Sequence, residues 1–188
     1  MIQLIGPGGA GKSTAGAALA ERINIPFIDL DLCFLDRVGD ISLHIQQQGY
    51  EAYARQNVEV YGSLAAEVRP LSVMALSSGF MTYADDIHPA YFALRARIEA
   101  SPTTFVLLPS LDEETCVTEI VRRQLTRPFG GSAESEEAVI RKRFSIYMGV
   151  PARKVETGRP VSEVVDEIVG GLPPNSALHP AARFARGG

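Results

Sequence analysis

The fold is decided by the stretch Gly6-Pro7-Gly8-Gly9-Ala10-Gly11-Lys12-Ser13-Thr14, which follows an apolar run at residues 2–5. The stretch matches the pattern G-x-x-x-x-G-K-[ST], and the Ala- and Leu-rich residues 12–22 have helical spacing. Glycines let the backbone curl so that successive N–H groups face one anion, and the start of a helix adds its positive end. The sequence therefore predicts a strand, a phosphate-binding loop and a helix, in that order.

The residues of the loop also indicate which phosphate compound is bound. Lys12 is expected to reach the β- and γ-phosphates of a nucleotide, and Ser13 is expected to ligate Mg²⁺. We expect ATP with Mg²⁺, because the chain has no N-K-x-D-like segment of the kind that selects guanine. The predicted nucleotide contacts in the loop are Gly8, Gly9, Ala10, Gly11, Lys12, Ser13 and Thr14. The alternative interpretation is a glycine-rich turn that binds no nucleotide.

Apolar segments of strand length alternate with segments of helical spacing along the chain. The expected strands are residues 2–5, 26–29, 71–76, 104–108 and 154–157. The expected helices are residues 12–22, 50–68, 88–99, 112–125, 134–147 and 162–169, with 32–48 helical in part. This alternation predicts an α/β fold, a P-loop NTPase three-layer sandwich. Its mostly parallel five-stranded sheet should be covered by helices on both faces.

Composition limits the classes of partner. The 188 residues carry a formal net charge of −4, so we expect neither nucleic acid nor an anionic membrane surface as a partner. No run of eighteen apolar residues and no signal peptide is present, so no membrane span is expected. The two cysteines, Cys33 and Cys116, lack metal-ligand spacing. A cytoplasmic protein is therefore expected.

Two carboxylates and several arginines are candidates for the remaining chemistry. Asp29 and Asp31 follow a predicted strand, at the edge of the sheet where ligands bind in such folds. A carboxylate there can hold water on Mg²⁺, or can orient an acceptor hydroxyl and take its proton; two helix-capping or turn aspartates are the alternative. Arginines near a phosphate can neutralise charge in the transition state, although each could equally lie on a solvated surface. The candidates are Arg122, Arg123, Arg127, Arg143 and Arg159.

These motifs occur in the order seen in shikimate kinases, which the chain resembles over roughly residues 1–170. The motifs are residues 6–14, Ile28-Asp29-Leu30-Asp31, Arg127-Pro128, Arg143-x-x-x-Tyr147 and Thr157-x-Arg159-Pro160 with Val164-Val165. The resemblance implies that Asp29 serves the metal and Asp31 the acceptor hydroxyl. It also implies that Arg127 closes on the γ-phosphate from a lid. Arg123 and Arg159 are expected near the adenine, and Arg143 on a substrate carboxylate.

Domain organisation follows from the same resemblance. Residues 1–170 are expected to form one P-loop kinase domain, similar to nucleoside monophosphate kinases, with a short lid at about residues 122–134. Residues 171–188 are expected to form a flexible tail. We expect the chain to act as a monomer on a small-molecule acceptor. The catalytic residues implied are Lys12, Asp31 and Arg127.

The acceptor side departs from the family pattern at two places. The family's phenylalanine–arginine pair corresponds to Tyr53-Ala54, and the arginine is displaced to Arg55, about 100° around the helix. The family's three consecutive glycines correspond to Ser78-Gly79-Phe80, and we expect Phe80 to fill space that the glycines leave for the acceptor. The substrate-binding residues expected are Asp31, Arg55, Gly79 and Arg143.

The leading hypothesis is an enzyme of aromatic amino acid biosynthesis that transfers the γ-phosphoryl group of ATP to a hydroxyl of shikimate or a related hydroxy acid. Two alternatives remain open because the acceptor residues are altered. One is a regulatory module that binds nucleotide and transfers nothing. The other is a kinase for another acceptor, of the gluconate, nucleoside or antibiotic type.

Overall fold

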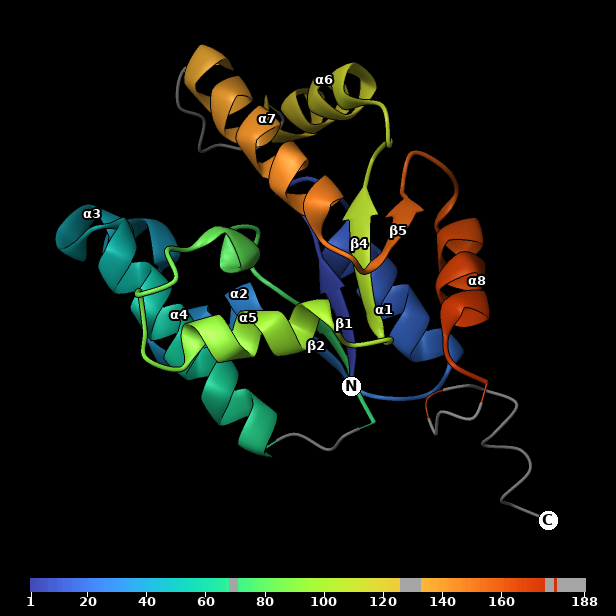
Figure 1. Ribbon diagram of the computed structural model, residues 1–188, viewed down its shortest axis with the longest axis horizontal. Coiled ribbons are helices and arrows are strands. Elements are labelled where there is room, and N and C mark those ends of the chain that lie inside the picture. The colour runs from blue at the N-terminus through green and yellow to red at the C-terminus, as the bar shows by residue number, and fades with distance from the viewer. Residues whose placement is uncertain (68–70, 126–132, 175–177, 179–188) are drawn as a thin grey trace.

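The computed structural model describes residues 1–67, 71–125, 133–174 and 178, and the side chains of residues 124–125 and 133–136 are outside this description. Five strands form one sheet in the order β2-β3-β1-β4-β5, and every neighbouring pair is parallel (Figure 1). The predicted α/β fold is confirmed, and the sheet is wholly rather than mostly parallel. The strands are β1 (Ile2–Ile5), β2 (Phe27–Asp29), β3 (Val73–Ala75), β4 (Thr104–Leu108) and β5 (Arg153–Glu156).

Helices connect these strands and cover both faces of the sheet (Figure 1). Helices α1 and α8 pack against one another and supply apolar side chains to one face, while α4, α5, α6 and α7 supply the other. The helices in the described residues are α1 (Lys12–Arg22), α2 (Leu30–Arg37), α3 (Ile41–Gln48), α4 (Tyr50–Glu67), α5 (Tyr91–Glu99), α6 (Glu113–Leu125), α7 (Ala133–Gly149) and α8 (Val161–Gly171), with a 3₁₀ turn η1 (Phe80–Thr82).

The two faces of the central strand explain why three of its four residues are apolar. Ile2 and Leu4 belong to the hydrophobic cluster under α1 and α8, whereas Ile5 belongs to the cluster under α4 and α5. Successive side chains of a strand point to opposite faces, so a strand buried on both sides needs apolar residues at consecutive positions. This burial fixes β1 in the middle of the sheet, with the phosphate-binding loop at its carboxyl end.

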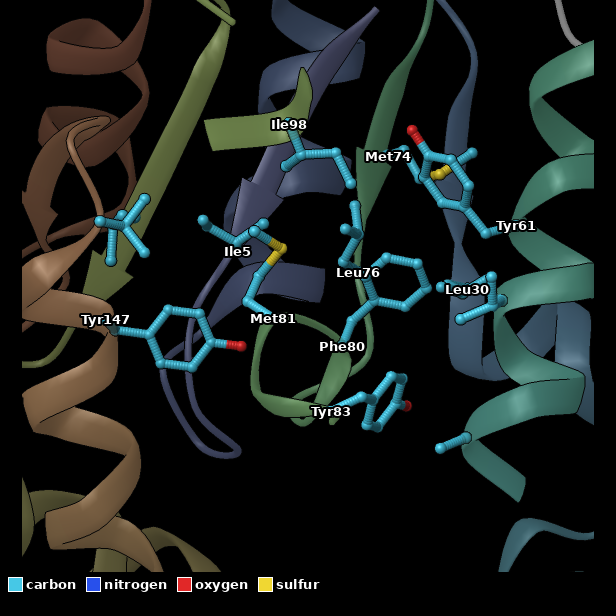
Figure 2. Packing of buried hydrophobic residues seen from close by; sticks show 14 of the residues in the cluster. Ile5, Leu30, Tyr61, Met74, Leu76, Phe80, Met81, Tyr83, Ile98 and Tyr147 are labelled. Carbon is cyan, nitrogen blue, oxygen red and sulfur yellow. The ribbon is translucent and has the colours of Figure 1, made fainter. Parts of the chain in front are cut away.

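The larger hydrophobic cluster is rich in aromatic rings (Figure 2). Phe80 of η1 packs against Tyr61 of α4, with ring centroids 5.1 Å apart, and against Tyr83 at 5.8 Å. Tyr147 of α7 closes the same cluster from the opposite side and is fully buried. The cluster therefore ties α4, η1 and α7 to the sheet, and these elements border the acceptor side of the site.

The sequence patterns predicted most helices and strands correctly, but a few of the predicted boundaries were wrong. The segment expected to be partly helical at 32–48 forms two helices, because Gly39 has a φ of 123° and the Asp40 side chain accepts from Leu43 N–H at 2.8 Å. The helix expected from residue 88 begins at Tyr91, and the turn η1 was not predicted. At the other end, α8 extends to Gly171, and Leu172 and Leu178 are buried.

No helix among the described residues is both long and apolar enough to span a bilayer.

Gly16 tests how tightly α1 packs on the sheet. A Cβ at this position would lie 2.4 Å from Phe27 Cε2 and 3.2 Å from Leu4 Cδ1. We expect Gly16→Ala to lower the free energy of unfolding by about 1–3 kcal/mol in urea denaturation, because overpacking outweighs the better helix propensity of alanine. Gly62→Ala in α4 is the matched control, since nothing lies within 4 Å of its added Cβ. That variant should gain about 0.5–1 kcal/mol, and equal stability of the two variants would contradict the packing described.

Candidate active site

The loop between β1 and α1 is held against the neighbouring strand by close backbone packing. A Cβ on Gly6 would lie 2.3 Å from the carbonyl oxygen of Leu107 in β4, so a side chain cannot be accommodated there. Gly11, the N-cap of α1, has φ 84° and ψ 14°, a left-handed conformation that glycine adopts without steric cost. These two positions explain why the loop needs glycine where the motif has it.

Side chains hold the carbonyl groups of the loop. Lys12 Nζ donates to the carbonyl oxygens of Gly6 at 2.7 Å and Pro7 at 2.9 Å, which keeps the ammonium group over the loop. Just after β5, Thr157 Oγ1 donates to the carbonyl oxygen of Ala10 at 2.9 Å. The sequence analysis used Thr157 only as part of a motif and did not predict this contact, because 147 residues separate the two partners.

Ser13 and Asp29 form the pair expected to serve the metal. Ser13 Oγ donates to Asp29 Oδ2 at 2.5 Å, while Asp29 Oδ1 accepts from the backbone N–H of Asp31 at 3.0 Å and of Leu32 at 3.4 Å. Asp29 therefore caps α2 and faces the loop at the same time, so the capping alternative and the metal-side role are compatible. A hydroxyl and a carboxylate oxygen are hard oxygen donors, which fit Mg²⁺ held mainly by nucleotide phosphates and water.

One cavity joins the loop to the acceptor side. Its volume is about 140 Å³, and its lining residues are Gly8, Gly9, Ala10, Gly11, Lys12, Ser13, Thr14, Asp29, Asp31, Leu76 and Ser78. Asp31 therefore lines the same cavity as the residues expected to hold phosphate.

A larger cavity of about 450 Å³ adjoins the first and shares Gly9, Gly11 and Thr14 with it. Its remaining lining residues are Ala15, Arg123, Thr157, Arg159, Val161 and Val164. The structure thus places both arginines expected near the adenine around one hollow beside the phosphate loop. The volume and the mixture of apolar and basic side chains suit a nucleoside.

Arg123 is fixed at the entrance of this cavity by two partners. Its Nη1 donates to the carbonyl oxygen of Gly9 at 2.9 Å, and its Nε donates to Glu119 Oε1 at 2.7 Å. Hydrogen bonds from Arg122 and Arg123 lower the pKa of Glu119 to about 2, so this carboxylate stays charged across the neutral range. Arg122 is two-thirds exposed and lines neither cavity. Arg127 and most of the expected lid lie outside the described residues.

The acceptor end is bordered by α7 and the turn after β3. Arg143 Nη1 donates to Ser78 Oγ at 3.4 Å, and Tyr147 Oη donates to the carbonyl oxygen of Ser78 at 3.0 Å. The i, i+4 pair predicted from the sequence therefore holds this turn from one helix face. Gly79 lies beside Arg143, since a Cβ on Gly79 would be 3.3 Å from Arg143 Nη2.

Two expectations for the acceptor end are not met. Arg55 is exposed, its Nε donates to the carbonyl oxygen of Ile87 at 3.2 Å, and it lines neither cavity, so the structure does not bring it to Arg143. The expectation that Phe80 fills acceptor space is wrong, because η1 turns its ring into the core, where it is fully buried (Figure 2). Arg55 does not reach Arg143 because of its position on α4. Phe80 does not enter the acceptor space because the 3₁₀ turn directs its ring into the core.

A buried polar cluster beneath the acceptor end was also missed. Asn57 is fully buried in α4, and its Nδ2 lies 2.8 Å from Ser77 Oγ, 2.9 Å from Tyr83 Oη and 3.0 Å from Tyr53 Oη. Burial is the main cause that raises the pKa of Tyr53 to about 12, and the Asp31 carboxylate acts in the same direction. The one sequence signal was Asn57 itself, a polar residue on the apolar face of a predicted helix, four residues after Tyr53.

Comparisons with known proteins agree with this geometry. The family model for shikimate kinase matches residues 8–172. A shikimate kinase of Paracidovorax citrulli is 30% identical over 173 residues, covering 89% of this chain and 88% of the relative. One of Nitratidesulfovibrio vulgaris is 29% identical over 179 residues, covering 89% and 92%.

Solved structures show the same fold. The shikimate kinase from Acinetobacter baumannii in complex with shikimate superimposes with a TM-score of 0.70 at 24% identity, covering 89% of each chain. A gluconokinase from Sinorhizobium meliloti reaches a TM-score of 0.58 at 18% identity, covering 98% and 96%. At these identities the likeness establishes the architecture alone, whereas the family model spans most of the sequence, loop and acceptor side included. The chain belongs to the shikimate kinase family.

Proposed function

We propose that this chain transfers the γ-phosphoryl group of ATP to a hydroxyl of shikimate. The observation that carries the proposal is that the phosphate loop and Asp31 line one and the same cavity, in a chain that belongs to the shikimate kinase family. An enzyme that moves a phosphoryl group needs its two substrates in line and close together, with charge neutralised around the transferred group. The cavity provides a place where both substrates can meet.

The nucleotide half of the site follows from the loop. Backbone N–H groups of residues 8–14 and the Lys12 ammonium would hold the phosphates, with the positive end of α1 behind them. Arg123 and Arg159, which line the adjoining cavity, would pack around the base and ribose. Arg127 remains a proposed lid arginine that closes on the γ-phosphate.

Ser13 and Asp29 would hold Mg²⁺, the former directly and the latter through water. When bound, the ion would neutralise charge on the β- and γ-phosphates. The short hydrogen bond between the two side chains already places both oxygen atoms next to the loop. Their shared position supports a metal site at the boundary between nucleotide and acceptor.

On the acceptor side, Asp31 would orient the attacking hydroxyl and take its proton as the phosphoryl group is transferred. Arg143 would bind the acceptor's carboxylate by a charge-assisted hydrogen bond. Gly79, beside Arg143, would border the acceptor without a side chain of its own. Cys33 and Cys116 are both free thiols, which supports a reducing cytoplasm as the place of action.

The activity itself is tested by measuring ADP release from Mg²⁺–ATP with and without shikimate. We expect shikimate to raise the rate well above the rate without acceptor, and quinate or gluconate to do so far less. Lys12→Met should abolish both activity and ATP binding by calorimetry, because it removes the ammonium that neutralises phosphate charge. An unchanged rate on adding shikimate to the wild-type protein would contradict the proposal.

Asp31 is expected to act in the transfer step and not in nucleotide binding. Asp31→Asn should lower kcat by about 10²- to 10⁴-fold, the usual contribution of general base catalysis, and leave the Kd for Mg²⁺–ATP nearly unchanged. Asp36→Asn is the matched control, because it makes the same change on the exposed part of the same helix. Loss of ATP binding in Asp31→Asn would show that the residue serves the nucleotide instead.

Asp29 offers a separate test of the metal. Asparagine can still accept the backbone hydrogen bonds that cap α2, so Asp29→Asn removes the charge and keeps the cap. We expect the Mg²⁺ concentration for half-maximal activity to rise roughly 10- to 100-fold, with thermal stability little changed. If the Mg²⁺ dependence were unaltered, Asp29 would be a capping residue only.

A further inference from the structure

Two polar groups from distant parts of the chain meet above Gly79. A Cβ built on Gly79 would lie 2.4 Å from Tyr50 Oη and 3.3 Å from Arg143 Nη2. The Tyr50 hydroxyl thus occupies the space above Gly79 and lies less than 6 Å from Arg143 Nη2, so one small anionic group could contact both atoms. Tyr50 is the first residue of α4, whereas Arg143 belongs to α7, so only the fold brings them together.

The Tyr50 ring packs against other aromatic rings on one side and is exposed to solvent on the other. Its centroid lies 5.8 Å from that of Tyr53 and 6.0 Å from that of Tyr83, both of which are buried. The side chain itself is 43% exposed. Aromatic contacts of this kind fix a ring without engaging its hydroxyl, which remains able to donate to a ligand.

The layer beneath Tyr50 is rigid. Tyr53 and Tyr83 share the polar cluster around Asn57 described above, in which each hydroxyl lies within hydrogen-bond distance of Asn57 Nδ2. A buried polar cluster with several shared partners restricts the orientation of each member. Tyr50 therefore rests on rings that cannot easily rotate, and its hydroxyl is preorganised over Gly79.

This place lies next to the cavity, because Gly79 follows Ser78, while Tyr50, Gly79 and Arg143 are not themselves among the lining residues. Ser78, next to Gly79, lines the cavity together with Asp31 and the phosphate loop. Arg143 contacts Ser78 as well as the space above Gly79. An acceptor whose hydroxyl faces Asp31 would therefore present its other substituents to Tyr50 and Arg143.

The groups at this end suit a carboxylate. The two residues that follow Tyr53 supply no second guanidinium, because Ala54 has none and Arg55 is bonded to the Ile87 carbonyl. Arg143 offers N–H donors and Tyr50 offers an O–H donor. A carboxylate has two oxygen atoms and can accept one hydrogen bond from each residue.

We propose that Tyr50 is a specificity-determining residue whose hydroxyl binds the carboxylate of the acceptor together with Arg143, over Gly79. The proposal rests on the proposed function, since it deepens the assignment of the acceptor to a carboxylic acid. The Tyr50 phenol is then the second hydrogen-bond donor to the carboxylate, which Ala54 and Arg55 of α4 do not supply. Tyr50 adds binding that is equal in the ground state and the transition state, because the carboxylate does not react.

The test compares Tyr50→Phe with Tyr61→Phe, which removes the same hydroxyl from the same helix about three turns further on. Tyr61 is buried, and its Oη accepts from Gln3 Nε2 of β1 at 2.6 Å. We expect Tyr50→Phe to raise the KM for shikimate roughly tenfold or more, with kcat and the KM for ATP within about twofold of wild type. Tyr61→Phe should leave all three kinetic constants unchanged.

Shikimate methyl ester identifies which substituent Tyr50 binds. The ester keeps the ring hydroxyls and replaces the charged carboxylate with a neutral, weaker acceptor, so the loss of kcat/KM in Tyr50→Phe should be clearly smaller for the ester than for shikimate. An equal loss with acid and ester would overturn the proposal, because Tyr50 would then bind a ring hydroxyl. An unchanged KM for shikimate in Tyr50→Phe would overturn it too, while leaving the proposed function intact. Failure of the wild-type protein to phosphorylate shikimate would instead remove the proposed function, and this inference with it.

Discussion

The site depends on how the carbonyl groups of the loop after β1 are engaged. Lys12 holds two of them, Thr157 holds that of Ala10, and Arg123 holds that of Gly9. A carbonyl oxygen turned toward a phosphate would repel it, so these contacts from α1, from α6 and from the residue after β5 stabilise a loop conformation suited to an anion. The order of the sheet makes this possible, because β1 is central and its loop is within reach of elements from both halves of the chain.

A second constraint connects the nucleotide to the acceptor. Asp29 lies at the end of β2, which is separated from β1 by β3, yet its side chain reaches Ser13 and also caps α2. Because the cap fixes the first turn of α2, it fixes Asp31 as well. One aspartate thereby fixes Ser13 and Asp31 relative to each other, which phosphoryl transfer would require of the metal side and the acceptor side proposed above.

The acceptor side is assembled differently from the nucleotide side. The loop is a contiguous segment with a strict motif, whereas Tyr50, Gly79 and Arg143 come from three separate elements that share a rigid aromatic layer. Binding of nucleotide can therefore persist while the residues around the acceptor change. Within a family of one chemistry, such an arrangement allows the donors for one carboxylate to differ between members.

The sequence by itself determined the phosphate loop, the alternation of strands and helices, and the identity of Asp29, Asp31 and Arg143 as candidates. These features are local, since a motif, a periodicity or a strand end can be recognised within a few residues. The tertiary structure alone decided that Phe80 turns into the core, that Arg55 bonds to Ile87 and that Tyr50 meets Arg143 over Gly79. Those outcomes depend on the rotation of α4 against the sheet and on contacts between residues far apart in the chain, and no local pattern encodes them.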